Sequence, residues 1–355
     1  MDKLSFLVSW GGIRKTGWNG THISLFRALR KFYDVQDIDL KRNKWIDAFK
    51  HYVLHIDRLV TARNHRTSYR KKLENLQGKV FQFNDILSDT ENRQTYMYVD
   101  LTVSFLNSLR KNDQQMFIES GFKCPNPDIM ESRAKEQDCY IANSSGLFTV
   151  GHWLQDWLIH KGIPSDCVHF AGGGTNVDVS LINPLPKTHN KILFIGMDFR
   201  RKGGFITYEA FKLLRESGEN VELYVIGPSS NPIKSPENGY HYIGQISFDE
   251  EAKYLNMCDI FCMPSYFEAY GLVFVEALTF GLPCIGRNRQ EMPYFIKDGE
   301  TGLLLKNDDP NELAHLMLRA LHEKSFSENV LARREQYIND YSWDTVAKRI
   351  ASIIR

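Results

Sequence analysis

Short apolar runs alternate with amphipathic stretches along the whole chain. A first series of strand-like runs lies in the amino-terminal half, at 4–10, 79–84, 96–100, 140–144 and 167–171, with helical patterns at 21–32 and 101–110. A second series follows at 191–196, 221–227, 259–264, 283–286 and 302–305. Strands that alternate with helices form parallel sheets covered on both faces. Because the runs are nearly all apolar, they also fit strands that are buried on both faces.

The two series are separated by a break in the periodic pattern. Residues 180–190 contain two prolines and no hydrophobic period, which is typical of an interdomain linker. We therefore expect a first Rossmann-like domain at 1–180, a linker at 181–190 and a second such domain at 191–335. Residues 336–355 form a carboxy-terminal segment, in which 342–350 reads as an amphipathic helix. In doubly wound sheets ligands bind outside the carboxyl ends of the strands, so two such domains facing each other would share a cleft.

Composition narrows the class of protein. The chain has 355 residues, of which 43% are hydrophobic and 25% charged, the balance of a soluble globular protein. No apolar run approaches the roughly 20 residues that span a bilayer, and the start does not read as a secretory signal. We therefore expect a cytoplasmic protein. The six cysteines form no C-x-x-C pair, and Asp37-Ile38-Asp39 reads as surface, so neither a metal nor another cofactor is expected.

An excess of positive charge is concentrated in the amino-terminal part of the chain. Residues 1–80 carry 17 Lys and Arg against 7 Asp and Glu, although the whole chain has a net charge of only +1. The basic residues between 58 and 72 fit either a solvated helix face or contact with anionic lipid headgroups or a lipid-diphosphate acceptor. Nucleic acid is not expected as a partner, because no binding motif is present and the remaining residues are net acidic.

The most informative segment runs from 264 to 283. A strand ends near Pro264, and a helix is predicted at 272–280 after a loop that ends in Gly271. A helix that begins after a buried strand attracts phosphate through its free N–H groups and its dipole. Glu268 precedes this helix start and Glu276 lies about one turn inside it, and a carboxylate can accept two hydrogen bonds from a sugar diol. The alternative is a pair of solvated surface carboxylates.

This segment resembles the E-x7-E signature of the family 4 retaining glycosyltransferases, which have the two-domain GT-B fold. Ala269 and Tyr270 stand where the family's pattern has glycine and phenylalanine. The resemblance implies that Glu268 binds hydroxyls of the donor sugar and that Glu276 binds the ribose of the nucleotide. It also implies that backbone N–H groups near Tyr270, Gly271 and Leu272 contact the sugar and diphosphate.

The resemblance extends to other parts of the chain. The loop at 195–204 is similar to the family's basic glycine loop, and Lys202 matches its lysine, which would stabilise the leaving diphosphate without a metal. Many members have an arginine at the place of Met197, so Arg201 is the candidate substitute; the alternative for 200–202 is a solvated loop.

The resemblance also implies that backbone groups of Ile246 contact the base of the nucleotide, whereas the plain alternative is an ordinary strand end. The last helix would return to the first domain.

Three features of the first half complete the candidate site. The resemblance implies that the loop containing Gly12 closes over the donor diphosphate and the acceptor, although residues 11–17 also fit a simple tight turn. Asp100, at a strand's carboxyl end, fits a ligand of the acceptor hydroxyl or a base, or else the N-cap of the next helix. Asn176 and Asp178 resemble the family's structural N-G-V-D turn at the end of the first domain.

The sequence thus predicts a metal-independent retaining glycosyltransferase of hexosyltransferase type. The donor would be a UDP- or GDP-linked sugar, and the acceptor a glycan or lipid-linked sugar in surface polysaccharide or glycolipid synthesis, at the cytoplasmic face of a membrane if the basic residues bind lipid. Two alternatives stay open: a nucleotide-sugar epimerase on the same fold, and a non-catalytic module that binds a sugar or nucleotide.

Overall fold

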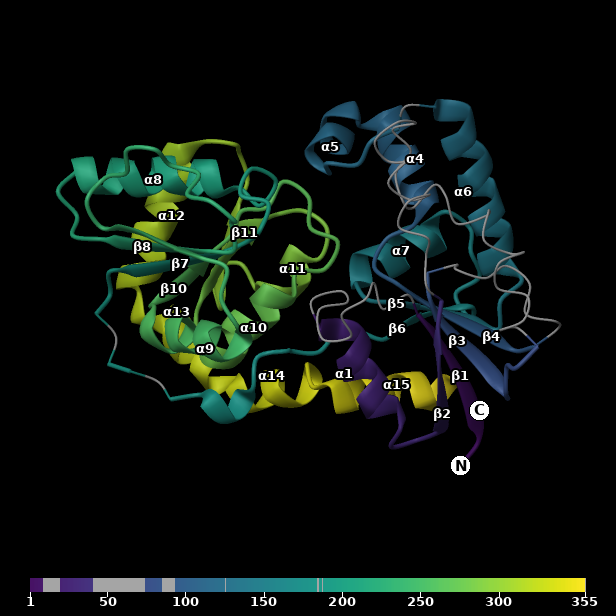
Figure 1. Ribbon diagram of the computed structural model, residues 1–355. Helices are drawn as coiled ribbons and strands as arrows, with labels where there is room; N and C mark the ends of the chain where they lie inside the picture. Colours follow the sequence, from purple (N-terminus) through teal and green to yellow (C-terminus); the bar gives the residue numbers. More distant parts are fainter. Residues whose placement is uncertain are drawn as a thin grey trace. The chain divides into compact units, whose positions relative to one another are not determined.

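The computed structural model describes residues 1–8, 20–40, 74–84, 93–124, 126–183, 185–186 and 188–354. The chain forms two compact units (Figure 1). The first consists of residues 1–174 together with 343–355, and the second of residues 175–342.

The first unit is built on a parallel sheet of six strands in the order β2-β1-β3-β4-β5-β6. The strands are β1 (Lys3–Val8), β2 (Asp34–Asp39), β3 (Lys79–Phe83), β4 (Thr95–Val99), β5 (Gly146–Thr149) and β6 (Val168–Phe170). The helices described in this unit are α1 (Thr21–Leu29), α4 (Val103–Asn112), α5 (Gln114–Glu119), α6 (Pro127–Ala142), α7 (His152–His160) and α15 (Trp343–Ile353).

The second unit also contains a parallel six-stranded sheet, in the order β12-β11-β10-β7-β8-β9. The strands are β7 (Lys191–Ile195), β8 (Glu222–Ile226), β9 (Tyr240–Gly244), β10 (Ile260–Cys262), β11 (Cys284–Arg287) and β12 (Gly302–Leu305). The helices are α8 (Gly204–Glu216), α9 (Phe248–Met257), α10 (Leu272–Phe280), α11 (Met292–Phe295), α12 (Pro310–His322), α13 (Lys324–Ala332) and α14 (Arg334–Asp340), with a short 3-10 turn η4 (Val179–Leu181).

Helices cover both faces of the second sheet. Helices α8 and α12 lie on one face and α9 and α10 on the other (Figure 1). The chain starts this sheet at its centre with β7, runs outward to β9, and returns to the centre at β10. The direction of winding therefore reverses between β7 and β10, and ligands of such sheets bind outside the carboxyl ends of the strands at this point.

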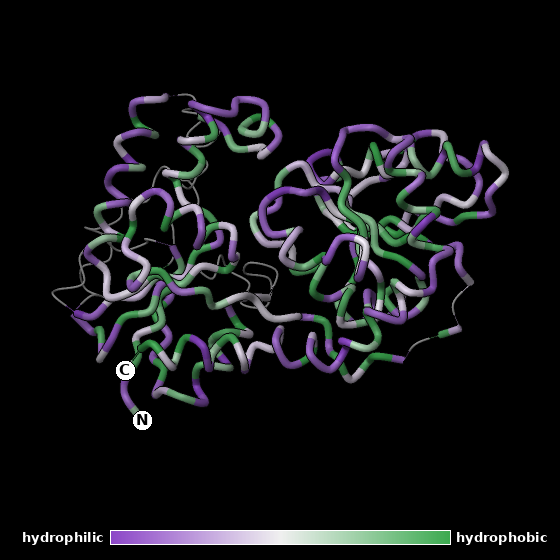
Figure 2. Tube along the Cα trace, turned by 180° about the vertical axis from the view of Figure 1, so that it is seen from behind, coloured by the Kyte–Doolittle hydropathy of each residue, from purple (hydrophilic) through white to green (hydrophobic). Residues whose placement is uncertain are grey.

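Aromatic side chains form much of the core of the first unit. The rings of Phe6 and Phe81 stack with centroids 5.9 Å apart, and Phe83 meets Phe6 edge-on at 5.4 Å. Phe148 and Tyr98 extend the same layer across β4 and β5. Much of the trace at the centre of each unit is hydrophobic in Figure 2, as expected for central strands covered on both faces.

Helix α15 completes the first unit. Its apolar face is buried through Val346, Ala347 and Ile350. The hydroxyl of Tyr33, shortly after α1, donates a hydrogen bond of 2.7 Å to the carbonyl of Ile354. Arg349 donates to the carbonyl of Ala171 at 3.1 Å. The segment expected to return to the first domain, 336–355, is therefore divided, because α14 is part of the second unit and only 343–355 is part of the first.

The proline-containing segment expected to be a linker lies within the second unit. The Asp259 carboxylate accepts hydrogen bonds from the backbone N–H groups of Asn190 and Lys191 at 2.9 and 2.8 Å, and from that of Thr188 at 3.1 Å. Asn256 binds the backbone of the same segment at Asn183, at 2.9 Å. Two buried polar side chains therefore attach this non-periodic stretch to the second sheet.

One predicted strand is wrong. Residues 140–144 form the last turn of α6 and the turn after it, and the strand lies further along the chain as β5. The apolar residue Ile141 of this run packs into the core from a helix. Asn143 ends that helix with a backbone N–H donated to the carbonyl of Cys139 at 3.2 Å. A run of three apolar residues fits the end of a helix as well as a short strand.

Candidate active site

The candidate site lies at the carboxyl ends of β7 and β10, where the winding of the second sheet reverses. The loop after β7 carries Arg201 and Lys202, and the loop after β10 carries Glu268 and ends at Gly271. The backbone N–H of Tyr266 donates to the carbonyl of Arg201 at 2.9 Å, which joins the two loops. As a result, Lys202 and Glu268, which are 66 positions apart in the chain, become neighbours.

Lys202 and Glu268 form a buried ion pair. The Lys202 ammonium donates to Oε2 of Glu268, and the two side chains are only 15% and 9% exposed. Burial lowers the pKa of Lys202, and the Glu268 carboxylate opposes that shift. The alternative of a solvated loop at 200–202 is therefore wrong for Lys202. A cation and a carboxylate held out of water exert much stronger electrostatic forces on a ligand than exposed ones.

Arg201 contacts the protein backbone at this site. Its guanidinium donates to the carbonyl of Phe267 at 2.8 Å and pairs with Asp198 at 3.4 Å. Met197, at the place where the family has an arginine, is 64% exposed. Arg201 thus holds the loop that carries Glu268, and its contact with a donor phosphate stays a prediction.

Gly271 lets Glu268 approach the start of α10. Its φ is +95°, in the left-handed region that side chains disfavour. A Cβ at this position would come within 2.9 Å of the Phe274 ring and 3.0 Å of Cγ of Glu268. Among the described residues, no side chain caps this helix start through a hydrogen bond.

Tyr270 and Leu272 flank Gly271 at the helix start. The side chain of Tyr270 is buried and meets the Phe295 ring edge-on at 5.0 Å, so only its backbone is placed to contact a ligand. Leu272 is half-buried as the first residue of α10. Ile246 is half-buried just after β9, and its role toward a base stays a prediction.

Glu276 is 2% exposed and points toward the turn that follows the first unit. Its Oε1 accepts the backbone N–H of Asn176 at 3.0 Å, and the N–H of Val177 also donates to its carboxylate. Burial raises the pKa of Glu276 well above its ordinary value, and the carboxyl of Glu251 on α9 raises it further. Burial also raises the pKa of Glu251, to about 7. The alternative of two solvated carboxylates is therefore wrong for both Glu268 and Glu276.

The predicted residues of the first half are only partly described. Gly12 and the basic residues 58–72 lie outside the described residues. Asp100 follows β4 directly and is half-buried. The N-cap of α4 is Thr102, whose hydroxyl accepts the N–H of Phe105 at 3.2 Å, so the alternative of Asp100 as N-cap is wrong. Its role toward the acceptor stays a prediction.

No metal cluster is found among the described residues: none of their His, Cys, Asp and Glu side chains form a group of three or more suited to an ion. Asp37 and Asp39, which the sequence analysis reads as surface, lie on β2 and are half-buried.

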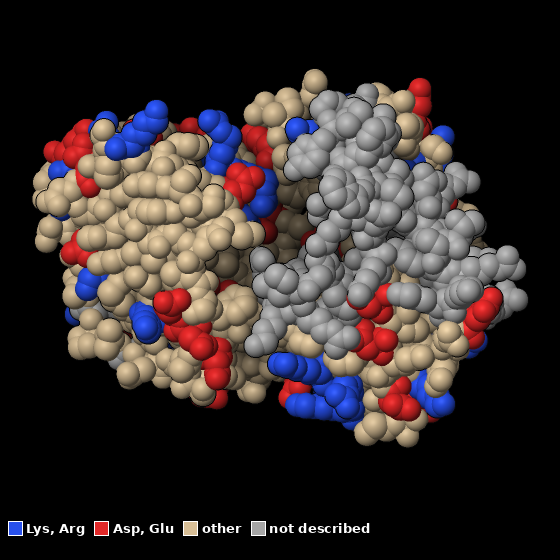
Figure 3. All heavy atoms as spheres, in the orientation of Figure 1, with Lys and Arg blue, Asp and Glu red and all other residues tan. Residues whose placement is uncertain are grey.

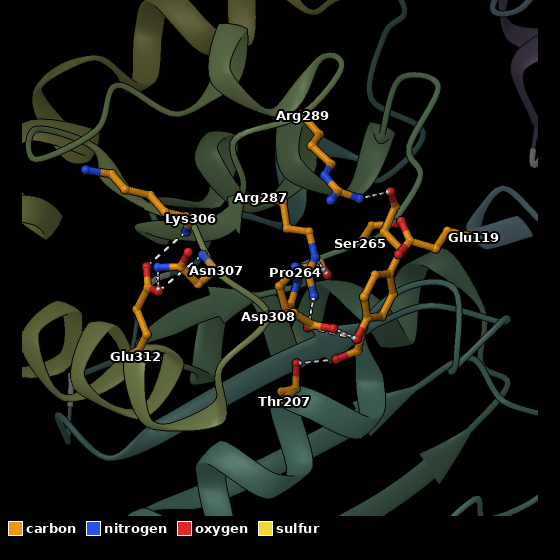
Figure 4. A network of polar contacts seen from close by, with 12 residues as sticks. Glu119, Thr207, Pro264, Ser265, Arg287, Arg289, Lys306, Asn307, Asp308 and Glu312 are labelled. Carbon is orange, nitrogen blue, oxygen red and sulfur yellow. Dashed lines mark hydrogen bonds and ion pairs between the residues drawn. The ribbon is translucent and has the colours of Figure 1, made fainter. Parts of the chain in front are cut away.

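A cation that the sequence did not single out lies beside this site. Arg287, the last residue of β11, is 3% exposed and contacts the loop after β10 (Figure 4). The available signal is a charged residue directly after an apolar strand-like run, at the edge of the sheet where ligands bind.

Sequence comparisons find similarity to glycosyltransferases. Residues 180–351, just under half of the chain, match the family model of glycosyl transferases group 1. The phosphatidyl-myo-inositol mannosyltransferase of Mycobacterium leprae is 26% identical over 219 residues, covering 59% of this chain and 58% of that protein. The D-inositol 3-phosphate glycosyltransferase of Corynebacterium glutamicum is 22% identical, covering 56% and 54%. The chain thus spans less than two thirds of the length of these curated relatives.

Solved structures resemble the whole chain. Sucrose-phosphate synthase from Thermosynechococcus elongatus superposes with a TM-score of 0.70 at 16% identity, covering 100% of this chain and 98% of that one. WaaG, a glycosyltransferase involved in lipopolysaccharide biosynthesis, gives a TM-score of 0.65 at 15% identity and covers 99% of both chains. The likeness confirms the expected α/β GT-B fold. The carboxy-terminal half of the chain is thus similar to the glycosyl transferases group 1, and the whole chain has the GT-B fold.

Proposed function

We propose that the protein is a retaining glycosyltransferase that moves a sugar from a nucleotide-sugar donor to an acceptor hydroxyl. The observation that carries this proposal is the buried pair of Lys202 and Glu268 beside the start of α10, at the reversal point of the second sheet. A buried cation, a buried carboxylate and a helix start without a side-chain cap suit a ligand that joins an anionic diphosphate to a polyhydroxylated ring.

Each group has a separate task in this proposal. The Glu268 carboxylate accepts hydrogen bonds from hydroxyls of the donor sugar. Lys202, with the backbone N–H groups at Gly271 and Leu272, stabilises the negative charge that grows on the leaving diphosphate, so no metal is required. Glu276 keeps lone pairs beyond those used by Asn176 and Val177, and these accept the ribose hydroxyls.

The transfer step needs no protein nucleophile. The acceptor oxygen forms the new bond to the anomeric carbon on the face from which the diphosphate leaves, while the bond from that carbon to the phosphate oxygen breaks. The acceptor's proton passes to a donor phosphate oxygen. Asp100 is the competing base, since it lies at the carboxyl end of β4, the edge where such sheets bind ligands.

The similar proteins favour particular substrate classes. One is named as a mannosyltransferase of phosphatidyl-myo-inositol, and the HepE structure from Anabaena was solved with UDP-glucose, at a TM-score of 0.68 and 13% identity. By analogy, the donor is a UDP- or GDP-linked hexose and the acceptor is a glycan or a glycolipid. Neither the epimerase nor the non-catalytic alternative is favoured by these relatives.

We place the reaction in the cytoplasm, at the membrane face where lipid-linked acceptors are found. Attraction to anionic lipid would come from the basic residues between 58 and 72, which lie outside the described residues. In the described part of the chain, no helix is long and apolar enough to cross a membrane. On the face of the second unit seen in Figure 3, acidic side chains lie near the basic ones.

The first test of the function is a panel of nucleotide sugars scored by thermal shift, because a bound donor must raise the apparent stability. The donor found in this way is then used to measure transfer by Glu268→Ala and Lys202→Met. We expect both variants to fold and to lose transfer by at least about 100-fold, the usual cost of removing a group that stabilises developing charge.

Lys212→Met is the matched control for Lys202→Met. Lys212 forms an exposed ion pair with Glu216 on α8, at 3.7 Å, and should not affect transfer. Wild-type turnover in Glu268→Ala or Lys202→Met would refute the assignment. Conversion of the donor to an isomer without any acceptor would instead indicate the epimerase.

A further inference from the structure

Arg287 makes three contacts from the end of β11, all near the loop that carries Glu268. Its Nε donates to the carbonyl of Pro264 at 3.0 Å, and its Nη2 donates to Oδ1 of Asp308 at 2.6 Å. Its guanidinium carbon lies 4.1 Å from the centre of the Tyr266 ring. In Figure 4 Arg287 reaches toward Pro264 and Asp308 from the strand above them.

Tyr266 and Asp308 close this arrangement. The Tyr266 hydroxyl donates to the Asp308 carboxylate, at 2.9 Å to Oδ1 and 3.1 Å to Oδ2. The three side chains come from the end of β11, from the loop after β10 and from the segment after β12, which are three adjacent strands of the sheet. We call Arg287, Tyr266 and Asp308 the arginine clamp.

The same loop is also contacted on its other side by Arg201, in the loop after β7. Arg201 donates to the carbonyl of Phe267, and the Ser265 hydroxyl donates to the carbonyl of Arg201 at 3.2 Å. The backbone at 264–267 is therefore fixed from both strands that neighbour β10, by Arg201 on one side and Arg287 on the other. Glu268 is the next residue of the chain.

The chemistry of these contacts requires an arginine. One planar guanidinium forks between a carbonyl and a carboxylate while its face lies on an aromatic ring, and the compact ammonium of lysine cannot make all three contacts. Burying a charge is costly, and an apolar side chain of similar volume often stabilises a fold as well. A task other than stability therefore accounts better for a cation at this position.

We propose that Arg287 is a positioning residue that, through the arginine clamp, fixes the loop at 264–268 so that Glu268 stands ready to bind the donor sugar. This inference rests on the proposed function, in which Glu268 holds the sugar and Glu276 the ribose. The clamp contacts the loop that precedes Glu268, whereas Glu276 lies inside α10. Loss of the clamp should therefore weaken the hold on the sugar and leave the hold on the nucleotide largely unchanged.

The test compares binding of a nucleotide sugar with binding of its bare nucleotide. UDP-glucose, UDP-N-acetylglucosamine and GDP-mannose, each against UDP or GDP, are titrated calorimetrically into wild-type protein, and the pair that binds is carried to the variants. For Arg287→Lys we expect the Kd of the nucleotide sugar to rise about tenfold, the loss of roughly one charged hydrogen bond. The Kd of the nucleotide should change by less than about twofold.

Two milder variants distinguish loss of the arginine clamp from a general loss of folding. Tyr266→Phe keeps the ring under Arg287 and removes only the hydroxyl bond to Asp308, and Asp308→Asn removes one exposed charge. Both should shift the Kd of the nucleotide sugar in the same direction as Arg287→Lys, by a smaller factor. The matched control is Arg334→Lys, because Arg334 donates to the Phe280 carbonyl at 3.2 Å at the far end of α10. It should leave the ratio of the two affinities unchanged, even if stability falls.

The decisive readout is a double-mutant cycle with Glu268→Gln. If Arg287 acts through Glu268, Arg287→Lys has no further effect on nucleotide-sugar affinity once Glu268 has been replaced. An equal loss of affinity for nucleotide and nucleotide sugar, or an undiminished effect in the Glu268→Gln background, would overturn the positioning role and leave the proposed function standing. Failure of the wild-type protein to bind any of the three pairs would overturn both.

Discussion

Burial decides what each charged residue of the candidate site can do. Lys202 and Glu268 are joined in a protected pair, so the ammonium keeps a carboxylate beside it when a donor is absent. The carboxyl of Glu276 is held by two backbone N–H groups, which fixes its orientation. These orientations result from contacts between distant segments, and the sequence pattern alone indicated only that the residues were present.

Gly271→Ala should impair both stability and transfer. The left-handed φ and the close approach of Phe274 and Glu268 leave no room for a Cβ, so we expect a loss of about 1–3 kcal/mol in the free energy of unfolding. Gly218→Ala is the matched control, because Gly218 has a similar φ of +94° but open space around a Cβ. Chemical denaturation and transfer rates of both variants check this prediction. Equal effects of the two substitutions would show that crowding around Glu268 is not the cause.

Glu251→Gln should change how stability depends on pH. Because the pKa of Glu251 is raised from 4.5 to about 7 in the folded protein, the folded state holds this proton more tightly than the unfolded state. Its contribution to stability is full below pH 4.5 and is lost as the pH rises toward 7. The stability of Glu251→Gln relative to wild type should therefore increase with pH in this window, by at most about 1.4 kcal/mol per unit. Denaturation curves at several pH values measure this difference, and a constant difference would contradict the assignment.

At the scale of elements, local signals predicted some boundaries well. The helix expected at 272–280 is observed with these bounds, because Gly271 and Gly281 adopt left-handed φ values of 95° and 92° on either side of it. The prediction of a strand at 140–144 is wrong, because the apolar residues of this run belong to the last turn of α6. The contacts of Arg287 could not be predicted, since its three partners are separated from it by 21 to 23 positions and are brought together only by the sheet.

The attachment of the segment at 188–191 depends on one carboxylate. Asp259 accepts three backbone N–H groups and the hydroxyl of Thr188. Asp259→Ala should therefore destabilise the second unit by about 2–3 kcal/mol, because three part-buried backbone N–H groups lose their partner together. Asp249→Ala, at an exposed position in the first turn of α9, is the control and should cost less than about 1 kcal/mol. Urea denaturation distinguishes the two, and a similar small loss in both would show that the segment is held by other contacts.

At the scale of the whole molecule, the alternation of strands and helices was sufficient to predict two doubly wound sheets, and the expected GT-B fold is confirmed by the solved structures. The exact division of the chain was harder to predict. Prolines suggest a boundary near 180–190, but hydrogen bonds to the buried side chains of Asn256 and Asp259 attach that stretch to the second unit. The chain instead changes units at 174–175 and again at 342–343.

Removal of residues 343–355 should affect one unit much more than the other. Helix α15 buries Val346 and Ile350 in the first unit and accounts for several of its long-range hydrogen bonds. We expect amide exchange to rise in α1 and β1 while β7, β8 and β10 stay protected. Mass spectrometry of exchange in the truncated and full chains measures this, with Lys348→Ala as a mild control. Equal loss of protection in both units would contradict the observed division.

The central claim is that a nucleotide sugar lies across the start of α10, with Glu268 at its sugar and Lys202 at its diphosphate. The most direct measurement is a crystal structure of the protein with the donor selected by thermal shift. The account predicts a sugar hydroxyl within hydrogen-bonding distance of the Glu268 carboxylate and the diphosphate against the N–H groups of Gly271 and Leu272. A donor bound elsewhere, or a Glu268 side chain turned into bulk water in the complex, would contradict it.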